Sequence, residues 1–174
     1  TVIKNNIEGD LIETGVWRGG AVILMKGILE SYNVHDRKVF VADSFEGLPE
    51  PDEEKYPLDK GDIHFKEDFL AISKETVEAN FKKYGLLDEN VKFLKGWFKD
   101  TLPSAPIEKL SVLRIDGDMY ESTMDAITNL YPKLVKGGFC IIDDYVHPPC
   151  KEAVDKFRTE NNISSPIHHV DWTG

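Results

Sequence analysis

Short apolar runs alternate along this chain with longer segments of helical periodicity, and this alternation restricts the fold more than any other feature. Runs rich in β-branched and aromatic residues predict strands at Asp10–Thr14, Lys38–Asp43, Val91–Leu94, Leu110–Ile115 and Phe139–Asp143. Apolar residues at helical spacing predict helices over Ala21–Leu29, Lys74–Tyr84, Thr123–Leu134 and Ala153–Glu160. Strands that alternate with helices form a parallel sheet covered on both faces. We therefore predict an α/β fold with a doubly wound, mostly parallel sheet.

Capping and turn residues refine these boundaries. Ser73 is a suitable N-cap for the second helix, and Gly85 is placed to end it. Gly137 and Gly138 predict a turn into the fifth strand, and His168–Trp172 predicts the start of another strand. Because this last strand would need an antiparallel neighbour, we expect the protein to continue beyond both ends of the chain.

Length and charge exclude several classes of protein. The 174 residues suit a single domain over residues 1–174, and 31 Asp and Glu against 21 Lys and Arg leave a net charge of −10. Nucleic acids and anionic lipids both require a basic face, so neither is an expected partner. The longest purely apolar run, Ala21–Met25, is too short to span a membrane. With only two cysteines and no visible secretion signal, we expect a cytoplasmic protein.

An irregular, acidic stretch interrupts the alternation over about residues 44–72. Ten acidic residues and three lysines lie between Asp43 and Phe69, together with Pro49, Pro51 and Pro57. Irregular stretches of this length inside a compact domain are commonly lids or disordered loops. We predict that residues 44–72 form a lid-like insertion.

Small or acidic residues follow every predicted strand, at the edge where open α/β sheets bind ligands. The glycines after the first strand would let the backbone approach a ligand closely, although their spacing is not that of a dinucleotide site. Asp43, at the end of the second strand, is placed to accept hydrogen bonds from two ribose hydroxyls. A nucleoside ligand is therefore predicted, with a turn-capping role for Asp43 as the alternative.

Four carboxylates are expected to meet at the ends of the fourth and fifth strands: Asp116, Asp118, Asp143 and Asp144. Their mutual repulsion would raise pKa values, and Mg²⁺ would relieve it because carboxylate oxygens are its preferred ligands. The alternative is that some of them cap helices or face water. A divalent ion can polarise a substrate hydroxyl, and a carboxylate outside its ligand set can take the proton. Asp118 is the candidate for that base.

These residues lie in longer stretches that resemble the macrocin O-methyltransferase (TylF-like) family. The stretches are GDLIETGVWRGGA at 9–21, VADSFEGLP at 41–49, YGLLD at 84–88, FLKGWFKDTLP at 93–103, LRIDGDMYESTM at 113–124 and LYPKLVKGGFCIIDDY at 130–145. The family includes novobiocin-type sugar O-methyltransferases, which have the Rossmann-like class I fold and require S-adenosylmethionine and Mg²⁺. The resemblance implies an O-methyltransferase acting on a hydroxyl of a sugar or another small polar natural product.

The resemblance also implies roles for individual residues. It assigns cofactor binding to Glu13, Thr14, Gly15, Val16, Trp17, Gly19, Gly20, Asp43, Ser44, Gly96, Trp97, Phe98 and Asp116. It assigns the metal to Asp116, Asp143 and Asp144, and the general base to Asp118, with His64 in the acidic insertion as a second candidate. Family members carry a further N-terminal region that helps to form an oligomer, so a homo-oligomer such as a dimer is an expected partner.

Three other functions stay open on the residues alone. A nicotinamide-dependent oxidoreductase could use the same sheet, but the glycine spacing and the acidic cluster oppose it. A metal-dependent phosphatase could use Asp116-x-Asp118, but it would need a catalytic Asp where Glu13-Thr14-Gly15 follows the first strand. A non-catalytic nucleoside-binding protein would be expected to lose polar residues at the strand ends, and here they are all present.

Overall fold

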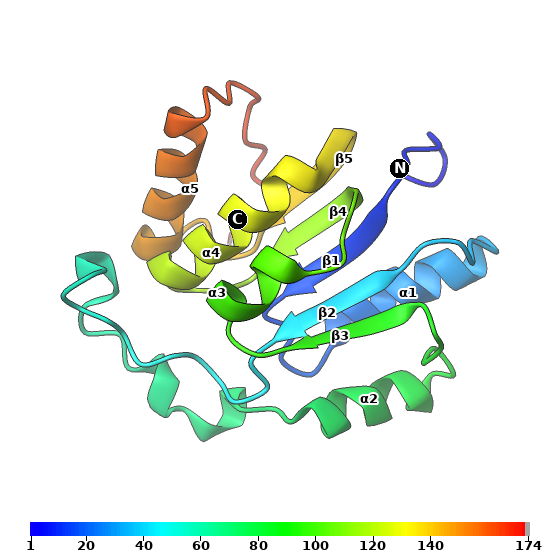
Figure 1. The fold of residues 1–174 in the computed structure, drawn as a ribbon, viewed down its shortest axis with the longest axis horizontal. Coiled ribbons are helices and arrows are strands. Elements are labelled where there is room, and N and C mark those ends of the chain that lie inside the picture. Colours follow the sequence, from blue (N-terminus) through cyan, green and yellow to red (C-terminus); the bar gives the residue numbers. More distant parts are fainter. Residues whose placement is uncertain (173–174) are drawn as a thin grey trace.

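The strands form one parallel sheet in the computed structural model, which describes residues 1–172 of the chain (Figure 1). They are β1 (Asp10–Thr14), β2 (Val39–Asp43), β3 (Val91–Lys95), β4 (Leu110–Ile115) and β5 (Leu134–Ile142). The order is β3-β2-β1-β4-β5, and every pairing is parallel. The strand order therefore reverses between β1 and β4, where open α/β sheets bind their ligands.

Helices cover both faces of this sheet, as predicted. They are α1 (Gly20–Ser31), α2 (Lys74–Lys83), the short α3 (Phe98–Thr101), α4 (Tyr120–Leu130) and α5 (Pro148–Glu160). Side chains alternate along β1, β2, β3 and β4 between two apolar cores, whereas β5 contributes to one core only. Ile12 and Phe40 pack with α4 and α5, whereas their neighbours Leu11 and Val39 pack with α1 and α2. The predicted doubly wound sheet is confirmed.

Several boundaries agree with the sequence, and the differences have local causes. The N-cap of α2 is Ser73, whose Oγ accepts a hydrogen bond from the amide of Thr76 at 3.2 Å. Helix α4 begins at Tyr120 instead of Thr123, because a carboxylate from the acidic insertion caps its first amides, as described below. Helix α5 begins at Pro148, since proline is well suited to the first turn of a helix. Helix α3 was not predicted.

Two sequence predictions are wrong. Gly137 and Gly138 do not form a turn before β5; they lie within it, and a Cβ on Gly138 would lie 3.0 Å from the carbonyl oxygen of Ser111 on β4. Gly138 thus allows the close approach of β5 to β4 where the β4–β5 register shifts. No strand forms at His168–Trp172 within the described residues, where Val170 and Trp172 are 87 % and 86 % exposed. An extended segment becomes a strand only beside another strand edge.

The acidic insertion, residues 44–72, runs past the carboxyl ends of the strands and contains three single-turn 3₁₀ helices (Figure 1). These are η1 (Pro57–Asp59), η2 (His64–Lys66) and η3 (Asp68–Leu70). Asp59 is only 1 % exposed and accepts hydrogen bonds from the first two amides of α4, Tyr120 at 2.6 Å and Glu121 at 3.1 Å. The insertion is therefore anchored beside the end of β4.

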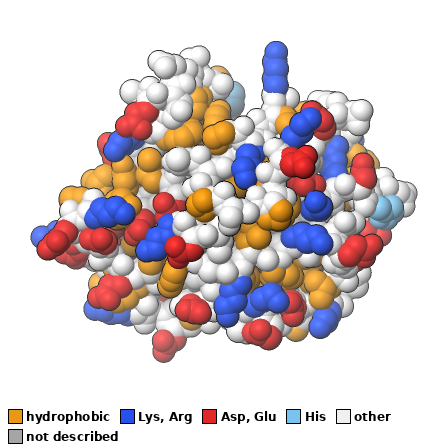
Figure 2. Space-filling view, viewed as in Figure 1, with side chains coloured by type: hydrophobic (Ala, Val, Ile, Leu, Met, Phe, Trp, Pro, Cys, Tyr) orange, Lys and Arg blue, Asp and Glu red, His pale blue; other side chains and the backbone are white. Residues whose placement is uncertain are grey.

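The charges are unevenly distributed over the surface. Figure 2 shows Lys and Arg side chains gathered over β3 and α2, whereas acidic side chains are more frequent toward the edge formed by the acidic insertion. In the part of the chain that the structure describes, no helix has the length and apolar character needed to cross a membrane.

Candidate active site

A cleft opens beyond the carboxyl ends of β1, β2, β3 and β4. Its empty volume, which includes open solvent at its mouth, is about 820 Å³. The predicted site residues that line it are Gly15, Trp17, Asp43, Ser44, Trp97, Phe98, Asp116 and Asp118. Leu48, Pro49 and Leu70 of the acidic insertion also line it, so the insertion forms one wall.

Three residues in the loops around this cleft have a left-handed backbone that side chains rarely adopt. Trp17, Phe45 and Asp118 have φ angles of 45°, 59° and 54°, and they follow β1, β2 and β4 respectively. Such conformations cost about 1–3 kcal/mol each and concentrate at functional sites. The Trp17 side chain also reaches the acidic insertion, because its Nε1 donates a hydrogen bond to the carbonyl oxygen of Phe69 at 2.9 Å.

The glycine-rich loop after β1 lies close to the residue that follows β4. Gly15 has a φ of 79°, and a Cβ added to it would lie 1.7 Å from the carbonyl oxygen of Asp116. Gly19 is the left-handed N-cap of α1, and Gly20 is its first residue. Thr14 and Val16 are buried, so their side chains lie in the protein interior and not in the cleft. From this loop, Gly15 and Trp17 line the cleft itself.

Asp43 is oriented by the loops around it. Its Oδ2 accepts a hydrogen bond from the amide of Val16, and its Oδ1 accepts one from the amide of Phe45, both at 2.7 Å. Burial raises the pKa of Asp43, and these amides oppose the shift. A carboxylate has about four lone-pair sites, so Asp43 can still accept a further hydrogen bond from a ligand. Ser44 supports the turn by donating to the carbonyl oxygen of Gly47 at 2.7 Å.

Two aromatic side chains after β3 face polar side chains of α4 across the cleft. Gly96, with a φ of 136°, turns the chain so that Trp97 and Phe98 line one part of it. Ser122 and Asp125 line it from α4, and sequence reasoning missed both. Burial, followed by the charge of Glu121, raises the pKa of Asp125 to about 6. Their three-residue spacing on a helix was the signal that could have found them.

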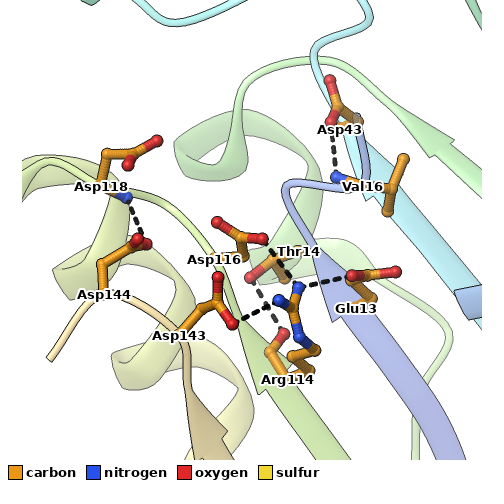
Figure 3. A network of polar contacts seen from close by, with 9 residues as sticks. All are labelled: Glu13, Thr14, Val16, Asp43, Arg114, Asp116, Asp118, Asp143 and Asp144. Carbon is orange, nitrogen blue, oxygen red and sulfur yellow. Dashed lines mark hydrogen bonds and ion pairs between the residues drawn. The ribbon is translucent and has the colours of Figure 1, made fainter. Parts of the chain in front are cut away.

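Three carboxylates meet where β4 and β5 end. Asp116, Asp118 and Asp144 each present an oxygen within 4.8 Å of the other two, and the amide of Asp118 donates to Asp144 Oδ2 at 3.2 Å (Figure 3). Burial and the charge of Asp144 raise the pKa of Asp116 to about 7, and burial and the charge of Asp118 raise that of Asp144 to about 6. Carboxylates that repel one another in this way suit a hard divalent cation.

Arg114, to which sequence reasoning gave no role, lies at the centre of a second group of carboxylates (Figure 3). Its Nη1 pairs with Glu13 Oε1 at 2.6 Å and with Asp116 Oδ2 at 2.7 Å, and its Nη2 pairs with Asp143 Oδ1 at 2.5 Å. Asp143 therefore lies beside Arg114 and outside the group formed by Asp116, Asp118 and Asp144. The signal in the sequence was an arginine within an apolar strand, two positions before an aspartate and so on the same face.

Glu13 lies behind the cleft and not in its wall. It is 2 % exposed, and its Oε2 has no hydrogen-bond partner in the structure. Burial raises the pKa of Glu13 to about 7 from 4.5, and Arg114 opposes this shift. Glu13 therefore affects the site through its ion pair with Arg114, which also pairs with Asp116 and Asp143.

The raised pKa of Glu13 predicts a pH-dependent stability. A carboxyl that holds its proton more tightly in the folded chain stabilises the fold at pH values below its unfolded pKa, and this contribution is lost as the pH rises through the folded pKa. From about pH 4.5 to 8, we expect the free energy of unfolding of the wild type to fall by roughly 3 kcal/mol more than that of Glu13→Gln. Urea denaturation at a series of pH values measures this difference. Parallel pH profiles for the two proteins would contradict it.

His64 lies on the acidic insertion, in η2, and its side chain is exposed. Its Nδ1 is 3.0 Å from Asp62 Oδ1. Burial and the charge of Asp116 raise the pKa of Asp118, and His147 and His64 oppose this shift. Of the two candidate bases, Asp118 lines the cleft and is the more buried, whereas His64 is not among the residues that line it.

Comparison with known proteins decides the family. Residues 1–174 match the family model described as Macrocin-O-methyltransferase (TylF). The chain belongs to the macrocin-O-methyltransferase family. As a member of that family it is an O-methyltransferase, and the resemblance read from its motifs is confirmed.

Curated members of the macrocin-O-methyltransferase family align with nearly the whole chain. The demethyldecarbamoylnovobiocin O-methyltransferase of Streptomyces niveus is 57 % identical over 175 residues, which are 99 % of this chain and 67 % of the relative. The mycinamicin III 3''-O-methyltransferase of Micromonospora griseorubida is 50 % identical over 177 residues, which are 100 % of this chain and 70 % of the relative.

Solved structures agree with the fold. The structure of the O-methyltransferase NovP superposes on this chain with a TM-score of 0.96 at 56 % sequence identity. The match covers 99 % of this chain and 72 % of the NovP chain. The calicheamicin methyltransferase CalS11 has a TM-score of 0.75 at 18 % identity over 96 % of this chain and 70 % of its own, so it supports the fold alone.

Proposed function

We propose that this family member transfers a methyl group from S-adenosylmethionine to a hydroxyl of a sugar or another small polar natural product, and that it requires Mg²⁺. The observation that carries the proposal is that one cleft is lined both by Asp43, which is suited to two ribose hydroxyls, and by Asp116 and Asp118, which form a three-carboxylate cluster with Asp144. The names of the relatives, which include novobiocin and mycinamicin enzymes, support an acceptor of this class. A cytoplasmic location and a homodimer stay predictions.

The residues around the cleft fit the proposed methyl donor. Asp43 would accept hydrogen bonds from the ribose hydroxyls, because its two backbone contacts hold the carboxylate in place and leave further lone pairs. Trp97 and Phe98 would pack against the adenine, whose flat ring is matched by aromatic side chains. The loop from Gly15 to Gly20 would lie along the methionine part, where Gly15 permits close approach of the backbone.

The carboxylates at the ends of β4 and β5 fit a magnesium ion by their chemistry and charge. The ligands we propose are Asp116, Asp143 and Asp144. Asp116 and Asp144 belong to the three-carboxylate cluster, whereas Asp143 lies beside Arg114, which pairs with one oxygen of Asp116 and one of Asp143. Bound there, Mg²⁺ would lower the pKa of the acceptor hydroxyl. The raised pKa values of Asp116 and Asp144 support this assignment, because a nearby dication favours the charged form of each carboxylate.

Asp118 would complete the reaction as the proton acceptor. The substrate hydroxyl would give its proton to the Asp118 carboxylate, and its oxygen would bond to the methyl carbon of the donor as the carbon–sulfur bond breaks. The electron pair of that bond stays on sulfur, which becomes a neutral thioether. Because the sulfonium is already a good leaving group, most of the rate enhancement would come from positioning the two reactants.

Calorimetry with S-adenosylmethionine and with NAD, each with and without Mg²⁺, tests the proposal. We expect S-adenosylmethionine to bind and NAD not to bind, and we expect methyl transfer to stop in EDTA and to return when Mg²⁺ is added. Binding of NAD without binding of S-adenosylmethionine would overturn the proposed cofactor. Full activity after complete removal of divalent ions would overturn the metal dependence alone.

A further inference from the structure

Arg114 forms ion pairs with three carboxylates at the same time. It lies in β4, which is paired on one side with β1 and on the other with β5, and its side chain is 16 % exposed. Of the nine residues drawn in Figure 3, six carry carboxylates and Arg114 is the one with a positive side chain. Its three recorded ion pairs reach Glu13, Asp116 and Asp143.

Nη1 and Nη2 of Arg114, which make these ion pairs, belong to one planar guanidinium, so their relative directions are fixed. Nη1 contacts Asp116 Oδ2 and Nη2 contacts Asp143 Oδ1, so one planar guanidinium spans carboxylates from the ends of β4 and β5. A guanidinium holds such a pair in a defined relative orientation, whereas an ammonium acts as a point charge. Glu13 Oε1 holds Nη1 from the side of β1, which limits rotation of the guanidinium.

From this geometry we propose that Arg114 is a positioning residue for the divalent cation. It engages one oxygen of Asp116 and one of Asp143, so the second oxygen of each would remain available to the ion. This inference rests on the metal dependence proposed above and adds the residue that orients the ligands. Groups that hydrogen-bond to metal ligands typically change metal affinity by about 10–100-fold when they are replaced.

The test is Mg²⁺ binding to Arg114→Lys, measured by calorimetry without cofactor and alongside thermal unfolding. The variant keeps the positive charge and loses the planar fork, so we expect it to bind Mg²⁺ at least about tenfold more weakly than the wild type. Arg37→Lys is the matched control, because Arg37 Nη1 contacts Ser111 Oγ near the start of the same strand, at the opposite end of the sheet. That variant is expected to bind Mg²⁺ like the wild type.

A second measurement uses the wild type and does not depend on how Arg114→Lys folds. We expect the Nε–Hε nuclear magnetic resonance signal of Arg114 to move when Mg²⁺ is added, while the signals of Arg18, Arg37 and Arg158 stay in place. Lysine variants of those three residues assign the signals by elimination.

The outcomes separate the two proposals. Unchanged Mg²⁺ affinity in Arg114→Lys, or an unmoved Arg114 signal at saturating Mg²⁺, would overturn the positioning role while the metal dependence stands. If the wild type itself does not bind Mg²⁺, the proposed metal dependence fails and the role of Arg114 fails with it.

Discussion

Replacing Asp118 with Asn is expected to lower turnover by about two to four orders of magnitude, because the amide cannot accept the proton of the acceptor hydroxyl. The substitution keeps the shape of the side chain. Asn also tolerates the left-handed backbone at this position, where φ is 54°, so the loop after β4 should keep its conformation. The backbone amide that donates to Asp144 Oδ2 is retained. Affinity for S-adenosylmethionine should therefore stay close to that of the wild type.

The measurement is single-turnover methyl transfer together with calorimetry of cofactor and Mg²⁺ binding. The first acceptor to try is demethyldecarbamoylnovobiocin, which is named in the 57 % identical relative, followed by other glycosylated natural products. Loss of cofactor binding in Asp118→Asn would refute the assignment as a base. Loss of Mg²⁺ affinity would instead make Asp118 a metal ligand, as its place in the cluster with Asp116 and Asp144 allows.

His64→Gln is the control for the second candidate base. Because His64 is exposed on the acidic insertion and pairs with Asp62, we expect this variant to keep most of its turnover. A large loss in His64→Gln with a small loss in Asp118→Asn would transfer the role of base to His64.

The second large effect is expected from Gly15→Ala, which should destabilise the fold by about 3 kcal/mol or more. The new Cβ would lie 1.7 Å from the carbonyl oxygen of Asp116, so the main chain must move. The amide of Asp116 donates to the carbonyl oxygen of Thr14 at 2.9 Å, and a shift there would separate the ends of β1 and β4. Both cofactor and metal affinity should fall, and urea denaturation with calorimetry measures these changes.

Gly61→Ala separates the collision from the backbone strain. Gly61 has a φ of 82°, close to the 79° of Gly15, but a Cβ there would meet no heavy atom within 4 Å. This control should lose only about 1 kcal/mol, which is the cost of placing an L side chain in the left-handed region. Equal losses in the two variants would mean that the contact with Asp116 is not the cause.

Local patterns in the sequence predicted most of the sheet. The bounds of β1 and β4 agree with those expected from their apolar runs, and Ser73 caps α2 as predicted. These features depend on residues within a few positions of one another, and periodicity and capping act over that range. The failures at Gly137, Gly138 and His168–Trp172 arose where a strand depends on its neighbour, which local patterns do not specify.

The candidate site also has features that the sequence predicted and features that it did not. The residue types at the strand ends were sufficient to predict a nucleoside site beside an acidic cluster, because the carboxyl ends of parallel strands meet at one edge of the sheet. The partners within that cluster were not predictable. Arg114 reaches Glu13 across 101 positions in the sequence, and Asp59 caps α4 across 61.

The sequence by itself therefore determined the fold class, the family and the edge of the sheet at which the candidate site lies. Only the tertiary structure decided that Asp143 pairs with Arg114 while Asp118 joins Asp116 and Asp144. The physical reason is that strand order, register and loop conformation set which side chains meet at a buried edge. Charge interactions there depend on separations of a few ångströms that no local pattern encodes.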